Sequence, residues 1–355
     1  MEKKFKKIGV LTSGGDAPGM NAVIKSVTCA AIEKGVEVIG ILGGYSGLIN
    51  DRTRKLTALD VTDIISKGGT MLYSDRCDEF KTEQGMQKAI ATCKRHNIDG
   101  IIAIGGDGTF RGATDLSIRG IPCIGVSGTI DNDITATDTT VGFDTAMNTV
   151  LSLGDALRDT SESHARCCVI EVMGRNAGYI ALETGIALNA IGVVLQEMPF
   201  DKERMFAKMK KMRELGQRSF VVIVAEGMGA PYAEALTKEI EEKTGIESRF
   251  IRPAHIVRGG IPTLADRSFA SKCGYKAVEA LLEGKSDLVI CSRHDEIVTT
   301  DIRWALIVDR MYKGKLKDGD LDKFTPEQIE EMKALCKERH DYFVKNYEIV
   351  NSIGC

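Results

Sequence analysis

The apolar residues of this chain fall into short continuous runs that alternate with longer stretches at helical spacing. A run of about five or six apolar residues is typical of a buried strand, and apolar positions three and four residues apart indicate an amphipathic helix. The runs predict strands at residues 7–11, 37–42, 100–104, 121–126, 167–172, 192–195 and 220–225, and the repeating pattern of helix and strand predicts one more at 247–252. The helical spacing predicts helices at residues 22–33, 83–96, 143–159, 179–188, 202–215, 233–243, 268–283, 300–312 and 325–346.

Strands and helices that alternate along a chain favour parallel sheets with helices on both faces. The predicted fold class is α/β, with two Rossmann-like parallel-sheet domains. The first domain is expected at 1–142 with about 256–306, and the second at about 143–255 with 307–324; a C-terminal helical tail follows at 325–355. Ligands bind beyond the carboxyl ends of the strands in such sheets, where this sequence has six glycine-bearing loops.

Composition narrows the class of protein only a little. The 355 residues are 43% hydrophobic and 27% charged, which is an ordinary globular mixture. A net charge of −3 gives no electrostatic reason to expect a nucleic-acid partner or an anionic membrane surface. The sequence has neither an apolar run of about 18 residues nor a signal-peptide pattern, so we expect a soluble cytoplasmic protein.

The cysteines and histidines show no spacing that is typical of a metal site. There are ten cysteines and five histidines, with no C-x-x-C pair and no H-x-x-x-H arrangement. The adjacent Cys167 and Cys168 lie in a predicted strand, which is a poor geometry for zinc. We therefore expect buried, reduced thiols instead of a zinc or redox centre.

Two loops that follow predicted strands have the clearest potential for chemistry. They are GGDGT at 105–109 and GTIDND at 128–133. Glycine backbone can approach phosphates closely, and a carboxylate is a hard ligand for a metal. Two carboxylates at a strand end are costly unless a positive or protic group faces them. The loops together predict a phosphoryl-transfer centre with a metal ligand in one and a base in the other.

Two further features admit a structural interpretation as readily as a functional one. The loop at 12–21 joins a strand to a helix, which is a geometry that presents backbone N–H groups to an anion. It matches neither G-x-G-x-x-G nor a P-loop, so alone it could equally be a structural turn. Arg76 could reach a phosphate, although a solvated surface arginine is the default for a single residue of this kind.

These motifs together closely resemble those of the 6-phosphofructokinase family of bacterial type. The matching segments are GVLTSGGDAPGMNA at 9–22, IGGDGT at 104–109, GTIDND at 128–133, MGR at 173–175 and HIVRGG at 255–260. GGDGT alone also resembles the phosphate loop of NAD kinases and lipid kinases, whereas the whole ordered set is highly specific. The segments lie at the family's spacing over roughly residues 7–312.

The resemblance implies a first domain that binds ATP and a second that binds a sugar phosphate, usually in a homotetramer. The implied reaction transfers the γ-phosphoryl group of ATP, with Mg²⁺, to the 1-hydroxyl of fructose 6-phosphate. In the family pattern Asp131 is the general base that accepts the hydroxyl proton, and Asp107 is the magnesium ligand. Thr129 and Arg175 match groups that contact the transferring phosphoryl.

The other implied contacts divide between the two substrates. The ATP contacts are Gly15, Arg76, Cys77, Gly106, Asp107, Gly108 and Thr109. The sugar-phosphate contacts are Thr129, Ile130, Asp131, Met173, Gly174, Arg175 and Glu226, with His255 and Arg258 at the 6-phosphate. The resemblance also implies that Arg166 and Arg249 reach the substrate of a neighbouring subunit, so that only the oligomer has a complete active site.

Two glycines bear on the identity of the phosphoryl donor. Pyrophosphate-dependent members of the family carry aspartate at the position of Gly108 and lysine at the position of Gly128. Either side chain would fill space that the α-phosphate of ATP and its neighbours need. Glycine at both positions therefore favours ATP.

The allosteric members of the family bind ADP or phosphoenolpyruvate in a basic pocket at a subunit interface. The matching positions here are Lys25, Cys29, Ala58, Arg158, Asn189, Ile191, Leu215, Gln217, Arg218 and Ser219. Cys29, Ala58 and Leu215 replace basic residues, and Ile191 replaces the acidic residue that would help to hold the metal of a nucleotide. Each charge-assisted phosphate contact is worth about 1.5–3 kcal/mol, so we expect weak or absent regulation by these effectors.

Other interpretations remain open on the sequence alone. All of the loops could be structural turns of an α/β protein. The chain could be a non-catalytic regulatory subunit, although such subunits tend to lose the base or the metal ligand, and Asp131 and Asp107 are both present. It could also be a pyrophosphate-dependent kinase, or an ATP kinase for another sugar phosphate such as sedoheptulose 7-phosphate.

Overall fold

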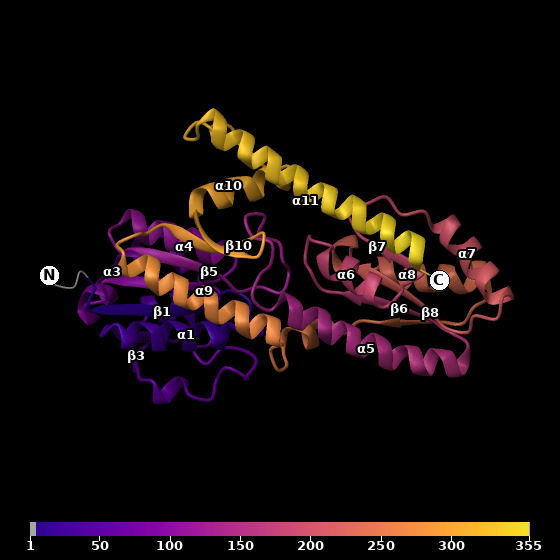
Figure 1. The fold of residues 1–355 in the computed structure, drawn as a ribbon, viewed down its shortest axis with the longest axis horizontal. Coiled ribbons are helices and arrows are strands. Elements are labelled where there is room, and N and C mark those ends of the chain that lie inside the picture. Colours follow the sequence, from indigo (N-terminus) through magenta and orange to yellow (C-terminus); the bar gives the residue numbers. More distant parts are fainter. Residues whose placement is uncertain (1–4, 355) are drawn as a thin grey trace. The chain divides into compact units, whose positions relative to one another are not determined.

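The computed structural model describes residues 5–354, which divide into two compact units (Figure 1). Unit 1 comprises the described residues up to Ile130, Ile134–Thr145 and Arg258–Cys336. Unit 2 comprises Asp131–Asp133, Ala146–Val257 and the described residues from Lys337 onward. Residues 1–4 and 355, which the predicted domain ranges include, lie outside the described residues.

Unit 1 is built on a seven-stranded sheet with the strand order β11-β10-β5-β4-β1-β2-β3. Its strands are β1 (Lys7–Ser13), β2 (Glu37–Ile41), β3 (Thr53–Leu56), β4 (Gly100–Gly105), β5 (Cys123–Ser127), β10 (Leu288–Arg293) and β11 (Glu296–Asp301). The inner strands are parallel to one another. The edge strands β3 and β11 run antiparallel to their neighbours. The predicted α/β class is confirmed, with antiparallel edges that the prediction lacked.

The sequence prediction did not include β3, β10 and β11. β10 has an apolar run of only four residues, and β3 is mostly polar because it lies at an edge of the sheet. β10 and β11 form a hairpin in which Arg293 pairs with Glu296. Its turn residues, His294 and Asp295, both have positive φ, at 50° and 65°. Asn-Gly and Asp-Gly are the usual residues of such a turn, so the sequence carried no hairpin signal.

Helices cover both faces of this sheet. They are α1 (Met20–Glu33), α2 (Gly44–Ile49), α3 (Glu83–His96), α4 (Asp107–Ile118), α9 (Leu264–Leu282) and α10 (Ile302–Tyr312). On one face α1 packs against α9, and a Cβ on Gly274 would lie 2.9 Å from the carbonyl oxygen of Val23. On the other face α2, α3, α4 and α10 enclose a core that includes Leu11, Phe110 and Trp304.

Unit 2 contains a smaller sheet of four parallel strands in the order β7-β8-β6-β9. The strands are β6 (Cys167–Val172), β7 (Gly192–Val194), β8 (Phe220–Ala225) and β9 (Ser248–Ile251). The helices are α6 (Tyr179–Ala187), α7 (Lys202–Glu214), α8 (Tyr232–Thr244) and most of α5 (Phe143–His164). Side chains of α7 and α8 pack against one face of the sheet around Phe206 and Leu236.

The C-terminal helix α11 (Pro326–Ile353) is longer than predicted and is more than a surface element. Its first part belongs to unit 1, where Met332 is fully buried in the core. Its later part belongs to unit 2, where Phe343 packs against Tyr179 with ring centroids 4.5 Å apart. The hydroxyl of Tyr347 donates to the carbonyl oxygen of Val193 at 3.2 Å. The high content of charged residues in this helix hid these buried positions.

The units divide the chain differently from the predicted domains at residues 307–324. The prediction assigned this segment to the second domain, whereas contacts place it in unit 1. Val308 of α10 is fully buried in the core of unit 1, and Leu321 and Phe324 pack against the same core. The hydrophobic side of α10 is therefore buried in the core of unit 1.

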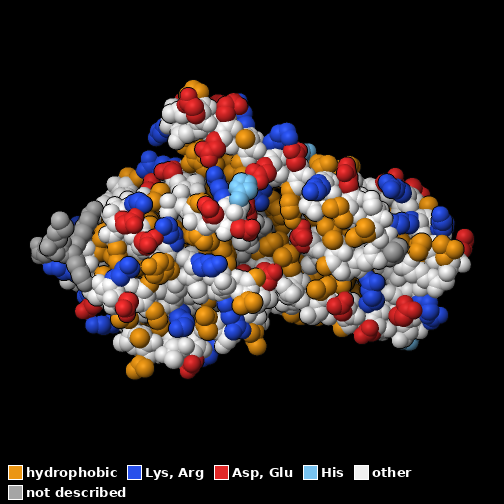
Figure 2. Space-filling model, viewed as in Figure 1, with side chains coloured by type: hydrophobic (Ala, Val, Ile, Leu, Met, Phe, Trp, Pro, Cys, Tyr) orange, Lys and Arg blue, Asp and Glu red, His pale blue; other side chains and the backbone are white. Residues whose placement is uncertain are grey.

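The surface contains charges of both signs. Figure 2 shows Lys and Arg side chains interspersed with Asp and Glu over the visible face. No helix within residues 5–354 is both long enough and apolar enough to cross a membrane.

A buried carboxylate joins the start of α9 to the segment that leads into α5. Asp266 is 2% exposed, and its two oxygens accept from the backbone N–H groups of Gly142 and Thr145, both at 2.8 Å. The hydroxyl of Thr145 donates to it as well, at 2.5 Å. Burial raises the pKa of Asp266, and the hydrogen bonds from Thr145 and Gly142 oppose this shift. The carboxylate therefore fixes this part of unit 1 at the cost of its own desolvation.

Replacing this carboxylate by an amide should destabilise the protein. Asp266→Asn keeps one acceptor oxygen and turns an N–H₂ group toward donors, so a buried donor loses its partner. We expect the free energy of unfolding to fall by about 1–3 kcal/mol, measured by denaturant titration with circular dichroism. The exposed Asp63→Asn is the control and should change it by less than about 0.5 kcal/mol. Equal losses in the two variants would contradict this role.

Candidate active site

The parallel register of β1, β4 and β5 brings three loops to one edge of the larger sheet. Ser13 pairs with Gly105, and Gly105 pairs with Ser127, so the three strands end at the same level. The loops that follow are residues 14–19, the start of α4, and residues 128–130. The sequence motifs thus converge within unit 1, as the rule for the carboxyl ends of parallel strands requires.

Hydrogen bonds fix these loops to one another. The hydroxyl of Thr109 donates to the carbonyl oxygen of Ser13 at 3.0 Å, and the N–H of Gly128 donates to that of Gly105 at 2.9 Å. The hydroxyl of Tyr45 donates to the carbonyl oxygen of Thr109 at 2.6 Å. Burial raises the pKa of Tyr45 well above its usual value, which keeps this hydroxyl protonated as a donor. These hydrogen bonds fix the GGDGT loop to the ends of β1 and β5 and to α2.

The start of α4 faces open space. A Cβ built on Gly106 or on Gly108 would meet no atom within 4 Å. The helix begins at Asp107; the N–H of Thr109 donates to the carbonyl oxygen of Gly106 at 2.9 Å, and the N–H groups before it have no partner inside the helix. Such a helix start attracts anions through these N–H groups and through the helix dipole. This loop can receive a phosphate group.

Asp107 is the acidic residue at this helix start. Its side chain is 35% exposed and forms an ion pair with Arg111, one turn later, at 2.6 Å. Within residues 5–354 there is no cluster of three or more His, Cys, Asp or Glu residues that could hold a metal. Mg²⁺ usually takes one or two carboxylates together with phosphate oxygens and water. A single accessible carboxylate beside a phosphate loop fits a metal that is shared with a bound phosphate.

The Arg258 guanidinium lies against the glycine-bearing loop at residues 14–19. Nη1 of Arg258 donates to the carbonyl oxygen of Asp16 at 3.3 Å. A Cβ on Gly15 would lie only 2.8 Å from the same nitrogen, so glycine allows the guanidinium to lie against the loop. Arg258 belongs to unit 1, whereas the predicted 6-phosphate partner His255 belongs to unit 2 and is exposed. The structure therefore assigns these two motif residues to different units.

The segment that carries Arg76 and Cys77 is anchored to the same loop. The hydroxyl of Ser74 donates to the carbonyl oxygen of Gly14 at 2.5 Å, and the N–H of Gly14 donates to that of Asp75 at 3.4 Å. Arg76 is exposed and directly follows this contact. The structure thus brings the predicted ATP contacts of unit 1 to one edge of its sheet.

In unit 2 the carboxylate of Asp131 faces a positive group. Asp131 is 2% exposed, and its Oδ2 lies 3.9 Å from Nε of Arg175. The Arg175 side chain is 62% exposed, so its guanidinium is also open to a ligand. Thr129 and Ile130, directly before Asp131, belong to unit 1. Ile130 is fully buried, which leaves its backbone as the part available to a substrate.

Glu226 holds the loop that carries Arg175. Its Oε1 accepts from two successive backbone N–H groups, those of Gly174 at 3.1 Å and Arg175 at 2.6 Å. Gly174 has φ 143°, and a Cβ there would lie 2.4 Å from the carbonyl oxygen of Ala177. The loop geometry therefore needs both this glycine and this carboxylate. Met173, at the start of the loop, is partly buried.

Arg166 and Arg249 converge on one carboxylate in unit 2. Nε of Arg166 lies 2.8 Å from Oε2 of Glu247, and Arg249 forms an ion pair with the other oxygen. The close ion pair with Arg166 and the charge of Arg249 lower the pKa of Glu247. The two residues predicted to act together are thus neighbours in the fold.

Sequence reasoning missed two residues that shape the site, and it missed the structural role of a third. Arg111 follows Asp107 by four residues on a helix, and this spacing could have predicted their ion pair. Tyr45 contacts Thr109 from far away in sequence, and no local pattern indicates it. Glu226 was predicted only as a substrate contact, and its grip on the Arg175 loop depends on the folded backbone.

Removing the Glu226 carboxylate should release this loop. In Glu226→Ala the N–H groups of Gly174 and Arg175 lose a charged acceptor, which is worth about 1.5–3 kcal/mol. We expect their amide hydrogen exchange to accelerate by about 10- to 100-fold, measured by mass spectrometry on a peptide spanning 173–178. Glu226→Gln retains one acceptor oxygen and is the matched control, with a smaller acceleration. Unchanged exchange in Glu226→Ala would rule out this anchoring role.

Parallel α/β sheets with a glycine-rich helix start, an accessible aspartate and a buried aspartate beside an arginine define a phosphate-binding α/β protein. The phosphofructokinase family matches residues 7–281, and the chain belongs to this family. The family predicted from the sequence motifs is therefore confirmed.

Curated relatives match over most of the chain. An ATP-dependent 6-phosphofructokinase of Bacillus licheniformis is 50% identical over 298 residues, which cover 84% of this chain and 93% of that protein. One of Clostridium botulinum is 49% identical over 314 residues, covering 88% of this chain and 98% of that protein.

Solved structures of phosphofructokinases share the fold. That of Saccharomyces cerevisiae has a TM-score of 0.83 at 28% identity over 93% of this chain, which spans half of the yeast chain. A pyrophosphate-dependent phosphofructokinase of Marinobacter aquaeolei has a TM-score of 0.75 at 23% identity over 84% of this chain. The latter likeness shows the fold alone.

Proposed function

We propose that this chain is a glycolytic, cytoplasmic kinase that transfers the γ-phosphoryl group of ATP to the 1-hydroxyl of fructose 6-phosphate, giving fructose 1,6-bisphosphate and ADP. The observation that carries the proposal is Asp131, a buried carboxylate beside the guanidinium of Arg175. Relatives about 50% identical over most of the chain carry the name of this activity, which supports the proposal. A regulatory subunit would not need the base and the accessible aspartate at position 107.

Asp131 is proposed to act as the general base. As the 1-hydroxyl oxygen forms its bond to the γ-phosphorus, its proton passes to the Asp131 carboxylate. The bond between the γ-phosphorus and the β–γ bridging oxygen breaks, and ADP leaves with that electron pair. Arg175 has two tasks, since it balances the buried charge of Asp131 and its exposed guanidinium can neutralise the moving phosphoryl group. Thr129 is proposed as a second contact to that group.

The loop at 106–109 is proposed to bind the phosphates of ATP. Its glycines leave open space before the first turn of α4, where the N–H groups that precede Thr109 have no partner inside the helix. Arg76 and Cys77 extend this site from the anchored segment, and Gly15 belongs to the neighbouring loop. Mg²⁺, held by Asp107 and the phosphates, would neutralise charge on the triphosphate. The Asp107 carboxylate would then exchange its ion pair with Arg111 for the metal.

The sugar phosphate is proposed to contact the remaining motif residues. Met173, Gly174, Arg175 and Glu226 form one loop system in unit 2, and Ile130 offers backbone groups. His255 and Arg258 are proposed for the 6-phosphate. Arg166 and Arg249 are proposed to reach a neighbouring subunit's substrate in a homotetramer, where an anionic phosphate would compete with Glu247 for their charge.

Regulation by ADP or phosphoenolpyruvate is proposed to be weak. Of the basic residues kept at the matching positions, Arg158 and Arg218 donate to backbone carbonyl oxygens of their own unit. Leu215, in place of a basic residue, is 71% exposed and offers no donor to a phosphate. These contacts support weak binding of a diphosphate, because the two guanidinium groups already donate to backbone carbonyl oxygens and Leu215 adds no donor.

Activity of the purified chain tests the function directly. With ATP and fructose 6-phosphate we expect coupled formation of ADP and the bisphosphate, and little effect of added ADP on the saturation curve. Asp131→Ala should lower kcat by about 10²–10⁴-fold, because the hydroxyl loses its base, while the KM for the sugar phosphate changes little. Near-normal turnover of this variant would exclude Asp131 as the base. Turnover only with pyrophosphate, or only with sedoheptulose 7-phosphate, would reassign the donor or the acceptor.

The donor preference can be tested at Gly108. An aspartate there would extend into the open space before the loop and repel phosphate oxygens. Gly108→Asp should raise the KM for ATP about tenfold or more without loss of stability, since aspartate suits a first helical turn. Gly108→Ala adds a Cβ without charge and should remain close to the parent. Equal KM values for ATP in the parent and in Gly108→Asp would contradict the assignment.

A further inference from the structure

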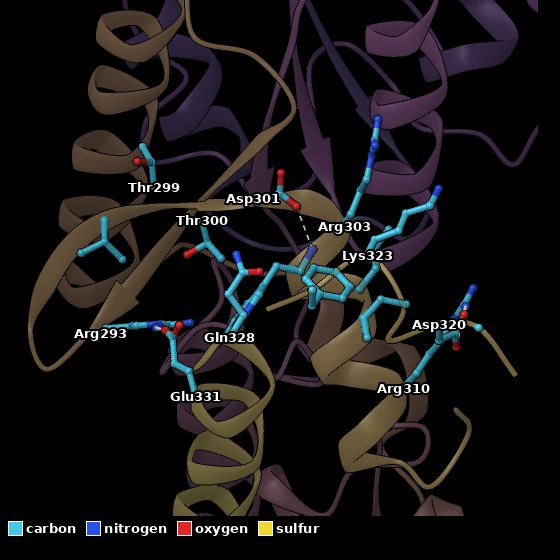
Figure 3. Close-up of a pocket in the computed structure, with 16 residues that line it drawn as sticks. Arg293, Thr299, Thr300, Asp301, Arg303, Arg310, Asp320, Lys323, Gln328 and Glu331 are labelled. Carbon is cyan, nitrogen blue, oxygen red and sulfur yellow. Dashed lines mark hydrogen bonds and ion pairs between the residues drawn. The ribbon is translucent and has the colours of Figure 1, made fainter. Parts of the chain in front are cut away.

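A pocket of about 780 Å³ lies in unit 1, away from every residue assigned to the candidate active site. Its walls come from the β10–β11 hairpin, the start of α10, the segment at 319–324 and the first turns of α11 (Figure 3). Pockets that bind small molecules typically measure about 300–1,000 Å³. The volume therefore suits a metabolite-sized ligand.

The carboxylates that line the pocket already have partners. Asp320 accepts from Nη1 of Arg310 at 2.9 Å, and Glu331 accepts from Nη1 of Arg293 at 3.1 Å. Asp301 caps α10 by accepting from the backbone N–H of Trp304 at 2.8 Å, which Figure 3 marks with a dashed line. The carboxylates of the wall thus already accept hydrogen bonds from groups of the protein.

Two buried donors in the wall have no acceptor. Trp304 is 4% exposed, and its Nε1 has no hydrogen-bond partner in the protein. Nη2 of Arg293 is also buried without an acceptor, although Nε of the same guanidinium donates to the carbonyl oxygen of Ala136 at 3.2 Å. The Arg293 guanidinium lies over the Trp304 ring, 4.9 Å from its centroid, so these two donors belong to one cluster. Buried donors of this kind call for an acceptor from a ligand or from solvent.

Further positive charge lies near the rim. Lys323 is exposed, and none of the carboxylates in the described part of the chain forms an ion pair with it. In the view of Figure 3, Lys323 and Arg303 extend in the same direction. With the carboxylates committed and donors unmet, the pocket is complementary to an anion that is rich in acceptor oxygens.

The rest of the wall is apolar. Leu306, Ile307, Val298 and Phe324 line the pocket and are partly buried against the core of unit 1. An inorganic anion alone would leave these side chains uncovered. The wall therefore suits a molecule with an apolar body attached to the anionic head.

We propose that this pocket is a binding site for an amphipathic anion, a phosphate or carboxylate that carries an apolar or aromatic body. The oxygens of the anion accept hydrogen bonds from Nε1 of Trp304 and Nη2 of Arg293, and Lys323 adds charge at the rim. The apolar body packs against Leu306, Ile307 and Phe324. This inference does not depend on the proposed kinase activity.

Trp304 is the sole tryptophan of the sequence, so its indole N–H gives a single reporter. The protein, labelled with ¹⁵N at the indole, would be titrated with phenyl phosphate and with phenylacetate while its indole resonance is recorded. We expect a saturable downfield shift of the N–H proton with at least one of the two, and the tighter binder identifies the head group. Inorganic phosphate supplies only the anionic head and benzyl alcohol only the aromatic body, so each should cause little shift. No shift with either aromatic anion, or an equal shift with phosphate alone or with the alcohol alone, would overturn the proposal.

Two variants test the named donors. Lys323→Gln changes an exposed residue and should weaken binding about threefold or more, whereas Arg293→Gln should weaken it about tenfold. Lys333→Gln lies on the same helix as Glu331 but outside the pocket wall, and should leave binding unchanged. Equal affinity of Lys323→Gln, Lys333→Gln and the parent would overturn the assigned rim charge. It would do so even if Arg293→Gln failed to fold.

Discussion

The parallel pairing of β1, β4 and β5 is the constraint on which the site in unit 1 depends. Because Ser13, Gly105 and Ser127 lie in register, the chain must leave the sheet at the same level in three places. The strand register alone therefore places backbone N–H groups, the Asp107 carboxylate and the segment that leads to Asp131 at one edge of the sheet. The hydrogen bond from Thr109 to Ser13 and the support from Tyr45 keep this edge from relaxing.

The sequence predicted the parts of the structure that depend on local pattern. The apolar runs located the inner parallel strands, apart from β10, and the glycine-bearing loops located Asp107 and Asp131. It could not predict β10 and β11, since a four-residue run and a turn made of His294 and Asp295 carry no strand or hairpin signal. It also missed the grip of Glu226 on two successive N–H groups, because that contact joins the ends of two strands far apart in the chain.

The two glycines that bear on the donor are not physically equivalent. In the sequence both read as positions without a side chain, but a Cβ on Gly108 meets open space. A Cβ on Gly128 would lie 2.8 Å from the terminal methyl of Met20 and 3.1 Å from Ile104. A side chain at 108 would therefore extend into open space in front of the loop, whereas Gly128 is required by packing behind it. A larger residue at 128 would need Met20 to move, so any substitution at this position also disturbs the core.

The path of α11 has a consequence for how the protein is made. Met332 is buried in the core of unit 1, and Phe343 and Tyr347 are buried in unit 2, yet α11 follows every strand of both sheets in the sequence. The larger sheet likewise waits for β10, which follows all of unit 2 except the end of α11. Neither core can close before these late segments have been synthesised. Until these late segments have been synthesised, the nascent chain exposes apolar surface that the folded cores bury, and exposed surface of this kind promotes aggregation.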